Sequence, residues 1–202
     1  MRDGPFRILL VCTGNICRSA LAERLLQVRL NAALGPAAAN TYQVSSAGTR
    51  SWDGACMDPF AALELRRLGG DPAGFRSRQL IPAHVEAADL VLTATVAHRS
   101  AVLSEAPEAL RRTFTIRELA ALTSLLAPDS DHAGLVAQAA ACRTSVPTDD
   151  LDVIDPYGAS AAVHREVADQ LSTAIGELVG LVLREDWPDL PRAWSAIVRR
   201  RQ

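Results

Sequence analysis

The sequence predicts a three-layer α/β sandwich in which a four-stranded parallel sheet carries helices on both faces. Short aliphatic runs alternate along the chain with segments of helical period, which is typical of parallel strands joined by crossover helices. The runs at residues 8–11 and 88–95 are largely aliphatic, as expected for strands buried on both faces. Two further strands are predicted at 42–46 and 112–116.

Helices are predicted at residues 18–34, 60–68 and 161–183, and a further helix is predicted to begin at His98 and Arg99. Gly35-Pro36 ends the first, because this pair does not continue a helix. Asp58-Pro59 is a start signal for the second, and Gly69-Gly70 closes it. The helix at 161–183 is long and carries apolar residues at helical spacing, so we expect it to pack on the sheet and complete the core.

Length and charge exclude several classes of protein. The 202 residues are most simply one domain, residues 1–202, large enough to bury about 70% of the unfolded surface. The formal net charge of -2 provides no basic field, so nucleic acid is not an expected partner. All 21 basic residues are arginine. The lack of lysine excludes the Gly-x4-Gly-Lys nucleotide loop and Schiff-base chemistry, so a phosphate site here depends on backbone N–H groups and arginine.

Cysteine usage and hydropathy predict the compartment. The four cysteines, at positions 12, 17, 56 and 142, lack the paired spacing of a zinc site or a disulfide framework. No secretion signal precedes the first predicted strand, and no apolar run approaches the roughly 18 residues that span a membrane. We therefore expect a cytoplasmic protein without a membrane span, and the arginine- and alanine-rich composition favours a bacterial source.

The segment after the first strand predicts an anion-binding site. It leads from the strand into the first helix and reads Cys12-Thr13-Gly14-Asn15-Ile16-Cys17-Arg18-Ser19. A loop in this position directs backbone N–H groups at one point, beside the positive end of the helix dipole. Cys12 opens the loop and Arg18 closes it, so a thiol faces an oxyanion held by a guanidinium group. A helix N-terminus and a nearby arginine favour the thiolate, which is the nucleophilic form.

Neighbouring residues favour a reactive role for Cys12 over that of a small buried apolar residue. Gly14 and Asn15 are the residue types that best tolerate the left-handed backbone of a tight loop. Ser19 can donate a hydrogen bond to the sulfur. Because these features agree with one another, we interpret the loop as a phosphate site with a cysteine nucleophile.

The pattern Val-Cys-x-Gly-Asn-x-Cys-Arg-Ser, at residues 11–19, resembles the signature of the low-molecular-weight protein-tyrosine phosphatase family. The resemblance continues at Ser46-Ala47-Gly48-Thr49, Trp52, Arg78-Gln79-Leu80, Ala88-Asp89-Leu90-Val91-Leu92 and Asp155-Pro156-Tyr157. It implies strand order 2-1-3-4, with the site at the carboxyl edge of the sheet. It also implies hydrolysis of phosphotyrosine through a phosphocysteine, with neither metal nor cofactor.

The family resemblance and the motifs together assign roles to individual residues. Cys12 is the expected nucleophile, Arg18 binds the phosphate, and Asp155 protonates the leaving oxygen, a role worth about 10² to 10⁴ in rate. Asp149, Asp150 and Asp152 are expected to stay exposed and ionised. The expected substrate-binding residues are Thr13, Gly14, Asn15, Ile16, Cys17, Ser19, Trp52 and Tyr157. The implied partner is a phosphotyrosine-containing protein such as a bacterial tyrosine kinase.

Two alternative reactions are considered. Thiol-dependent arsenate reductases have this loop but use closely spaced cysteines after the third strand, which Cys56 and Cys142 do not provide. Phosphoarginine phosphatases typically carry a small hydroxyl residue where this chain has Ile16, and the bulky side chain favours an aromatic ester. The resemblance also implies that Cys17 can form a reversible disulfide with Cys12.

One segment departs from the usual family length, and a tail follows the last predicted helix. Residues 117–150 contain two helix-like patches and form either a lid or partner surface near the site, or a helical layer that covers the sheet edge. His132, which lies near Asp129 and Asp131, is interpreted as part of a turn and not as a metal ligand. The tail at 186–202 is expected to be a short packed terminal helix with a basic end, the alternative being a docking helix for a partner or an anionic surface.

The segment after the third strand also differs from the family pattern. Many relatives have Met-Asp there, whereas this chain has Ala94-Thr95, so the acidic support of the family is missing. His98 follows shortly after and is expected to be a solvated or capping group.

Overall fold

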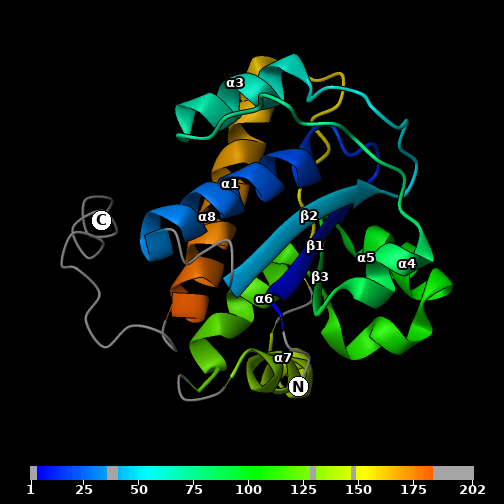
Figure 1. Cartoon of the computed structure of the whole chain (residues 1–202), viewed down its shortest axis with the longest axis vertical. Helices are drawn as coiled ribbons and strands as arrows, with labels where there is room; N and C mark the ends of the chain where they lie inside the picture. Colours follow the sequence, from blue (N-terminus) through cyan, green and yellow to red (C-terminus); the bar gives the residue numbers. More distant parts are fainter. Residues whose placement is uncertain (1–3, 36–40, 128–130, 147–148, 184–202) are drawn as a thin grey trace.

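The computed structural model describes residues 4–35, 41–127, 131–146 and 149–183 (Figure 1). It confirms the predicted α/β architecture, with four parallel strands in the order β2-β1-β3-β4. The strands are β1 (Phe6–Cys12), β2 (Tyr42–Gly48), β3 (Leu90–Thr93) and β4 (Thr113–Thr115).

Helices surround this sheet and keep the labels of Figure 1. The α-helices are α1 (Arg18–Leu34), α3 (Pro59–Arg67), α4 (Pro82–Ala87), α5 (Val96–Glu105), α6 (Ile116–Leu122), α7 (His132–Ala141) and α8 (Ala161–Leu183). The described residues also form the 3₁₀ helices η2 (Pro107–Arg112), η3 (Thr123–Leu125) and η4 (Arg143–Ser145).

Side chains of the central strand alternate between two apolar cores. Ile8 and Leu10 belong to the larger core, which α1, α3, α6, α7 and α8 complete. Leu9 and Val11 face the opposite side and pack in a smaller core with residues of α4, α5 and η2. This alternation follows from the period of two along a strand, so each face of the sheet has its own layer of helices.

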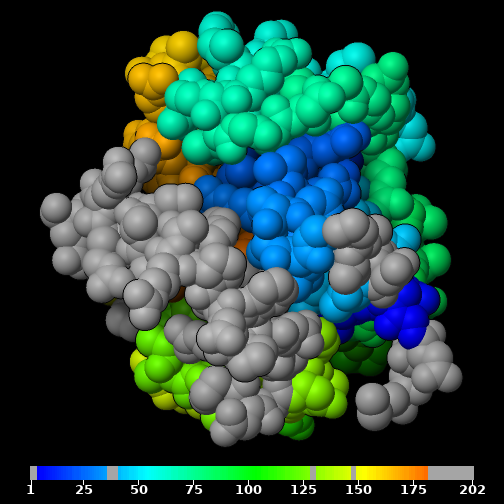
Figure 2. All heavy atoms as spheres, turned by 60° about the vertical axis from the view of Figure 1, so that its left-hand side comes forward, coloured from blue at the N-terminus to red at the C-terminus, as the bar shows by residue number. Residues whose placement is uncertain are grey.

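On the larger face, α1, α3 and α8 pack against one another. Figure 2 shows the teal helix α3 lying across α1, with the yellow-orange first turns of α8 beside it. Three helices that are distant in the sequence therefore meet close to the end of the sheet that carries the loop after β1.

Strand boundaries differ from the predicted ones at the edges. The predicted strand at 88–95 shortens to β3 because Ala88 is the C-cap of α4 and Thr95 is the N-cap of α5. The predicted strand at 112–116 shortens to β4 because Thr115 forms a capping box with Glu118 and starts α6. The first helix, α1, has the predicted bounds of 18–34.

Helix α7 covers the end of the sheet opposite to the loop after β1. His132 contacts Tyr42 through a 2.5 Å hydrogen bond and stacks on Phe6 with ring centroids 4.9 Å apart. Phe6 and Tyr42 are the first residues of their strands. The structure therefore favours the second interpretation of the 117–150 segment, a helical cover of the sheet.

Two further predictions concern the membrane and the tail. Among the residues that the structure describes, no helix has both the length and the apolar character needed to cross a membrane. The predicted tail at 186–202 lies outside the described residues.

Candidate active site

The loop at residues 12–19 joins the carboxyl end of β1 to the first turn of α1. Its carbonyl groups are fixed from outside, since Thr49 donates its N–H to Cys12, Arg50 to Thr13 and Asp58 to Ile16, each at 2.9 Å. In the described part of the chain, the N–H groups of residues 13–18 donate to no protein acceptor. The loop thus presents a set of unpaired donors at a helix N-terminus, as an anion site requires.

Asn15 holds the loop in its shape from behind. It is fully buried and has a φ of 53°, in the left-handed region that asparagine tolerates better than most residues. Its amide donates to the hydroxyl oxygens of Ser19 (2.9 Å) and Ser46 (2.7 Å), and its carbonyl oxygen accepts from the Arg78 backbone (2.9 Å). These three bonds stabilise a backbone conformation that would otherwise be strained.

Gly48 is the last residue of β2, and its lack of a side chain lets the end of β2 lie close to this loop. A Cβ at position 48 would lie 2.4 Å from the carbonyl oxygen of Thr13 and 3.0 Å from the backbone nitrogen of Asn15. Backbone atoms cannot move aside as a flexible side chain can, so only glycine fits here.

Cys12 lies buried at the base of the loop, with its Sγ atom 2.9 Å from the Oγ atom of Ser19. The Ser19 oxygen already accepts the amide proton of Asn15. Its own hydroxyl proton is therefore free to point at the sulfur, which would stabilise a negative charge there. This contact confirms the expected approach of Ser19 to Cys12.

Arg18 joins the loop to the segment that contains Asp155. Its side chain is 5% exposed and donates to the Asp155 carboxylate (2.7 Å), the Val153 carbonyl (3.3 Å) and the Thr13 hydroxyl (3.4 Å). Among the described residues its buried Nε has no hydrogen-bond partner. A buried guanidinium with a spare donor is suited to holding an additional anion.

These groups converge on one pocket of about 280 Å³. It is lined by Cys12, Thr13, Gly14, Ile16, Cys17, Arg18, Arg50, Trp52, Ala55, Asp155 and Tyr157. Trp52 and Tyr157 are 86% and 72% exposed. Asn15 and Ser19 were predicted to bind substrate but lie behind the pocket and support the loop.

The structure also identifies pocket and support residues that sequence reasoning missed. Arg50 and Ala55 line the pocket. Ser46 supports Asn15 and donates to Glu23 (2.5 Å), whose pKa is raised, chiefly by burial. Arg78 donates its Nε to the Ser46 carbonyl (2.7 Å). The only sequence signal for Ser46 and Arg78 was that both fall in segments resembling the family.

Cys12 and Cys17 are both free thiols in the structure. Burial, followed by the negative charge of Asp58, raises the pKa of Cys17 to about 12, so this side chain is a neutral thiol at physiological pH. The disulfide between Cys12 and Cys17 remains a prediction.

His98 contacts the loop, so the expectation of a solvated or capping group is wrong. Its side chain is buried, with Nε2 at 2.8 Å from the Thr13 hydroxyl and Nδ1 at 2.7 Å from the Thr95 hydroxyl. Thr95 itself caps α5. His98 therefore supports the loop from the side of α5.

The burial of His98 should make the stability of the protein depend on pH. Burial, followed by the positive charge of Arg18, lowers the pKa of His98 to about 4, compared with about 6.5 in an unfolded chain. Between these values the unfolded chain binds a proton that the folded chain does not, so stability should fall as the pH is lowered.

We expect His98→Gln, whose amide still reaches Thr13, to lose less stability than the parent between about pH 6.5 and pH 4. Thermal unfolding of the parent and the variant across this range measures the difference. Identical pH dependence in the two proteins would contradict the assignment.

Comparison with known proteins identifies the family of this chain. Residues 7–125 match the model of the family described as low molecular weight phosphotyrosine protein phosphatase. A protein-arginine-phosphatase of Geobacillus stearothermophilus is 30% identical over 174 residues, covering 86% of this chain and 94% of that protein. A low molecular weight protein-tyrosine-phosphatase of Streptomyces coelicolor is 31% identical over 181 residues, covering 88% and 93%. The solved structure of such a phosphatase from T. tengcongensis has a TM-score of 0.66 at 28% identity, covering 87% of this chain and 98% of that one.

Proposed function

Because this chain belongs to the low molecular weight protein-tyrosine phosphatase family, which consists of cysteine-dependent hydrolases, we propose that it hydrolyses phosphotyrosine in proteins through a phosphocysteine. The observation that carries this proposal is the convergence of Cys12, Arg18 and Asp155 on one pocket. These residues provide a nucleophile, an oxyanion clamp and a proton donor, which are the parts that the reaction needs.

In the first step, the thiolate of Cys12 attacks phosphorus in line with the bond to the phenolic oxygen. A sulfur–phosphorus bond forms while the phosphorus–oxygen bond breaks, and Asp155 transfers its proton to the departing oxygen. The unpaired N–H groups of residues 13–18 and the guanidinium of Arg18 hold the three equatorial oxygens. Ser19 stabilises the sulfur before the attack.

In the second step, water hydrolyses the phosphocysteine. Asp155, now ionised, removes a proton from the water as it attacks phosphorus, and the thiolate of Cys12 leaves. The products are inorganic phosphate and the original enzyme. Neither step requires a metal ion or a cofactor.

Arg18 and Asp155 exchange partners when substrate binds. In the structure they contact each other at 2.7 Å. A bound phosphate dianion provides a stronger, bidentate partner for the guanidinium. Asp155, released from the ion pair, takes up a proton from solvent and turns toward the leaving oxygen, to which it then gives that proton. The side chain of Asp155 is half exposed and can move in this way.

The pocket wall supports phosphotyrosine as the substrate. Ile16 lines the pocket, and the exposed rings of Trp52 and Tyr157 lie along the same pocket. Apolar and aromatic groups favour the phenyl ring of phosphotyrosine over the charged, strongly hydrated guanidinium of phosphoarginine.

Phosphoarginine is the second candidate substrate, because the relative from Geobacillus stearothermophilus that matches 86% of this chain is named a protein-arginine-phosphatase.

Substrate preference tests the proposal directly. In the presence of EDTA, we expect kcat/KM of the parent to be higher for a phosphotyrosine peptide than for the matching phosphoarginine peptide. Ile16→Thr should reduce this ratio by about tenfold or more, since removing apolar contact changes discrimination on that scale. Preference for phosphoarginine in the parent would assign the second candidate function instead.

The location and partner follow from the same chemistry. We propose that the protein works in a reducing cytoplasm, because its mechanism needs Cys12 as a free thiol. The proposed partner is a phosphotyrosine-bearing protein such as a bacterial tyrosine kinase, which would insert the modified side chain between Trp52 and Tyr157.

A further inference from the structure

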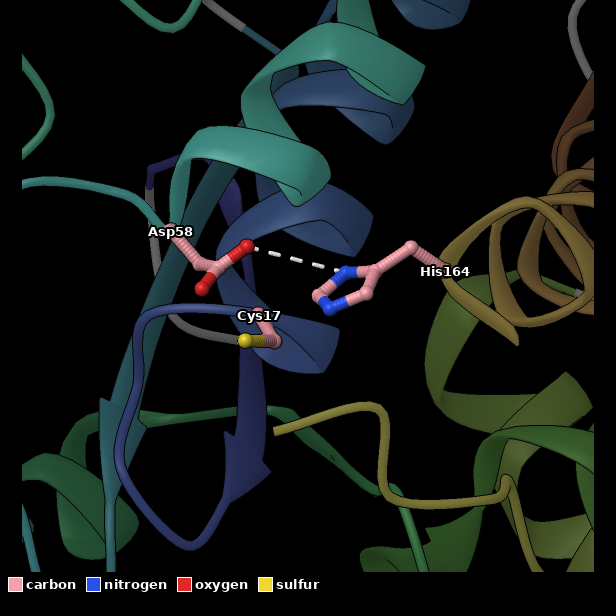
Figure 3. A group of neighbouring side chains, drawn as sticks. All are labelled: Cys17, Asp58 and His164. Atoms are coloured by element: carbon pink, nitrogen blue, oxygen red, sulfur yellow. Dashed lines mark ion pairs between the residues drawn. The ribbon is translucent and has the colours of Figure 1, made fainter. Parts of the chain in front are cut away.

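Three side chains that the phosphatase mechanism does not use face one another beside the active-site loop. Figure 3 shows Cys17 at the end of the loop, Asp58 at the start of α3 and His164 in the first turn of α8. Their sulfur, oxygen and nitrogen atoms all lie within 4.8 Å of one another. From this geometry we propose that Cys17, Asp58 and His164 form a binding site for one Zn²⁺ ion.

His164 provides an independent reason to look for a ligand here. Only 3% of this residue is exposed. Within the described part of the chain neither ring nitrogen makes a hydrogen bond, and the nearest charged atom is an Asp58 oxygen at 3.6 Å from Nδ1. A buried imidazole whose polar neighbours are a carboxylate and a thiol is placed as a metal ligand would be.

The identity of the donors selects the ion. Thiolate and imidazole are typical ligands of Zn²⁺, whereas Mg²⁺ and Ca²⁺ prefer oxygen donors alone. A tetrahedral zinc site has bonds of about 2.0–2.3 Å, which place its donor atoms roughly 3.2–3.6 Å apart. The three side chains would need to close in by about an ångström. Cys17 also lines the active-site pocket, so a water molecule can reach the fourth position.

Charge is balanced when the ion binds. Zn²⁺ replaces the thiol proton of Cys17, which passes to the solvent as the sulfur–zinc bond forms, while Asp58 binds as a carboxylate and His164 as a neutral imidazole. The two negative ligands cancel the charge of the ion. Asp58 is the N-cap residue of α3, and a helix N-terminus stabilises a negatively charged side chain.

A structural role without metal is the alternative. Asp58 already caps α3 by accepting hydrogen bonds from the backbones of Phe60 (2.9 Å) and Ala61 (3.1 Å). His164 packs against the Phe60 ring, with centroids 5.3 Å apart. With these contacts alone, the cluster would only help to pack three helices together. The experiment must therefore remove metal binding while keeping the helix cap at Asp58 and the ring packing against Phe60.

Suitable variants preserve these contacts. His164→Phe keeps an aromatic ring against Phe60, and Asp58→Asn keeps a good N-cap residue. His84→Phe is the matched control, since His84 lies in α4 and outside the cluster. Cys12→Ser tests whether the nucleophile binds the ion instead.

The experiment measures Zn²⁺ binding to the metal-free, full-length chain by competition with a chromophoric chelator. We expect one Zn²⁺ per chain in the parent, the control and Cys12→Ser. The affinity for Zn²⁺ should fall at least about tenfold in His164→Phe and Asp58→Asn. Mutating a residue that only hydrogen-bonds to a metal ligand already lowers metal affinity by this factor, and losing a ligand itself should lower it at least as much. Zn²⁺ should raise the Tm of the parent and leave that of His164→Phe unchanged.

A spectroscopic measurement separates the cluster from other sites. Co²⁺ bound to the parent should show thiolate-to-metal charge-transfer absorption, and Cys17→Ser should lack it. The proposal is overturned if the parent binds no Zn²⁺, if His164→Phe binds it as tightly as the parent, or if binding disappears in Cys12→Ser alone. None of these results depends on turnover, so they are independent of the substrate assignment.

Discussion

Cys12→Ser is expected to lower kcat for aryl phosphates by at least about 10⁴-fold while the fold is retained. The serine hydroxyl keeps nearly the same volume at this buried position, so the packing changes little. A serine hydroxyl is a much weaker nucleophile than a cysteine thiol unless a neighbouring base removes its proton, and in the proposed mechanism only Asp155 is available to remove it. The variant should still bind phosphate, because the N–H groups of residues 13–18 are unchanged.

Steady-state hydrolysis of a phosphotyrosine peptide and thermal unfolding measure the two parts of this prediction. Cys56→Ser is the matched control, since Cys56 is an exposed free thiol outside the pocket. Its activity should equal that of the parent. An active Cys12→Ser protein would show that the nucleophile lies elsewhere.

Asp155→Asn is expected to lower kcat/KM, which reports the steps up to formation of the phosphocysteine, by about 10² to 10⁴ on substrates with a poor leaving group. The amide has the shape of the carboxyl group but cannot give a proton to the departing oxygen. With a nitrophenyl ester, whose leaving group is stable as an anion, the loss should be much smaller. This dependence on the leaving group distinguishes a proton donor from a residue that only positions Arg18.

The measurement compares phenyl phosphate with a nitrophenyl phosphate in the parent, Asp155→Asn and Asp149→Asn. Asp149 is an exposed carboxylate near the same segment and serves as the control. An equal loss with both esters in Asp155→Asn would argue against a role as the acid.

The loop and its two flanking elements could be predicted from the sequence because their determinants are local. Four aliphatic residues, a loop containing Gly14 and a helical period follow one another directly, and α1 has the predicted bounds of 18–34. Asp155 could not be assigned in this way. It lies 137 positions from Arg18 in the sequence, and only the family resemblance connected the two segments before the structure did.

His98 and His164 show what sequence reasoning could not supply. Both occur at the beginning of a helix, where a histidine is usually solvated, and nothing near them in the sequence indicates burial. His98 is buried because α5 packs against β3 beside the loop, and His164 because α8 meets α1 and α3. Their environments depend on contacts between distant elements, which periodicity does not encode.

The position of α7 could not be predicted from the sequence for the same reason. Periodicity predicted helical patches in the 117–150 segment but left open which end of the sheet they cover. His132 supports the observed position through its polar and ring contacts with the first residues of β2 and β1. Neither pairing is visible in a linear sequence.

The central claim is that the Cys12 sulfur carries the phosphoryl group during turnover, and trapping that species tests it most directly. Asp155→Asn should slow release of phosphate from the enzyme, because the base that activates water is missing. Rapid quenching during turnover of a nitrophenyl phosphate, followed by mass spectrometry of the peptides, is expected to find phosphate on Cys12. Phosphate on another residue, or turnover without any phosphorylated enzyme, would contradict the account.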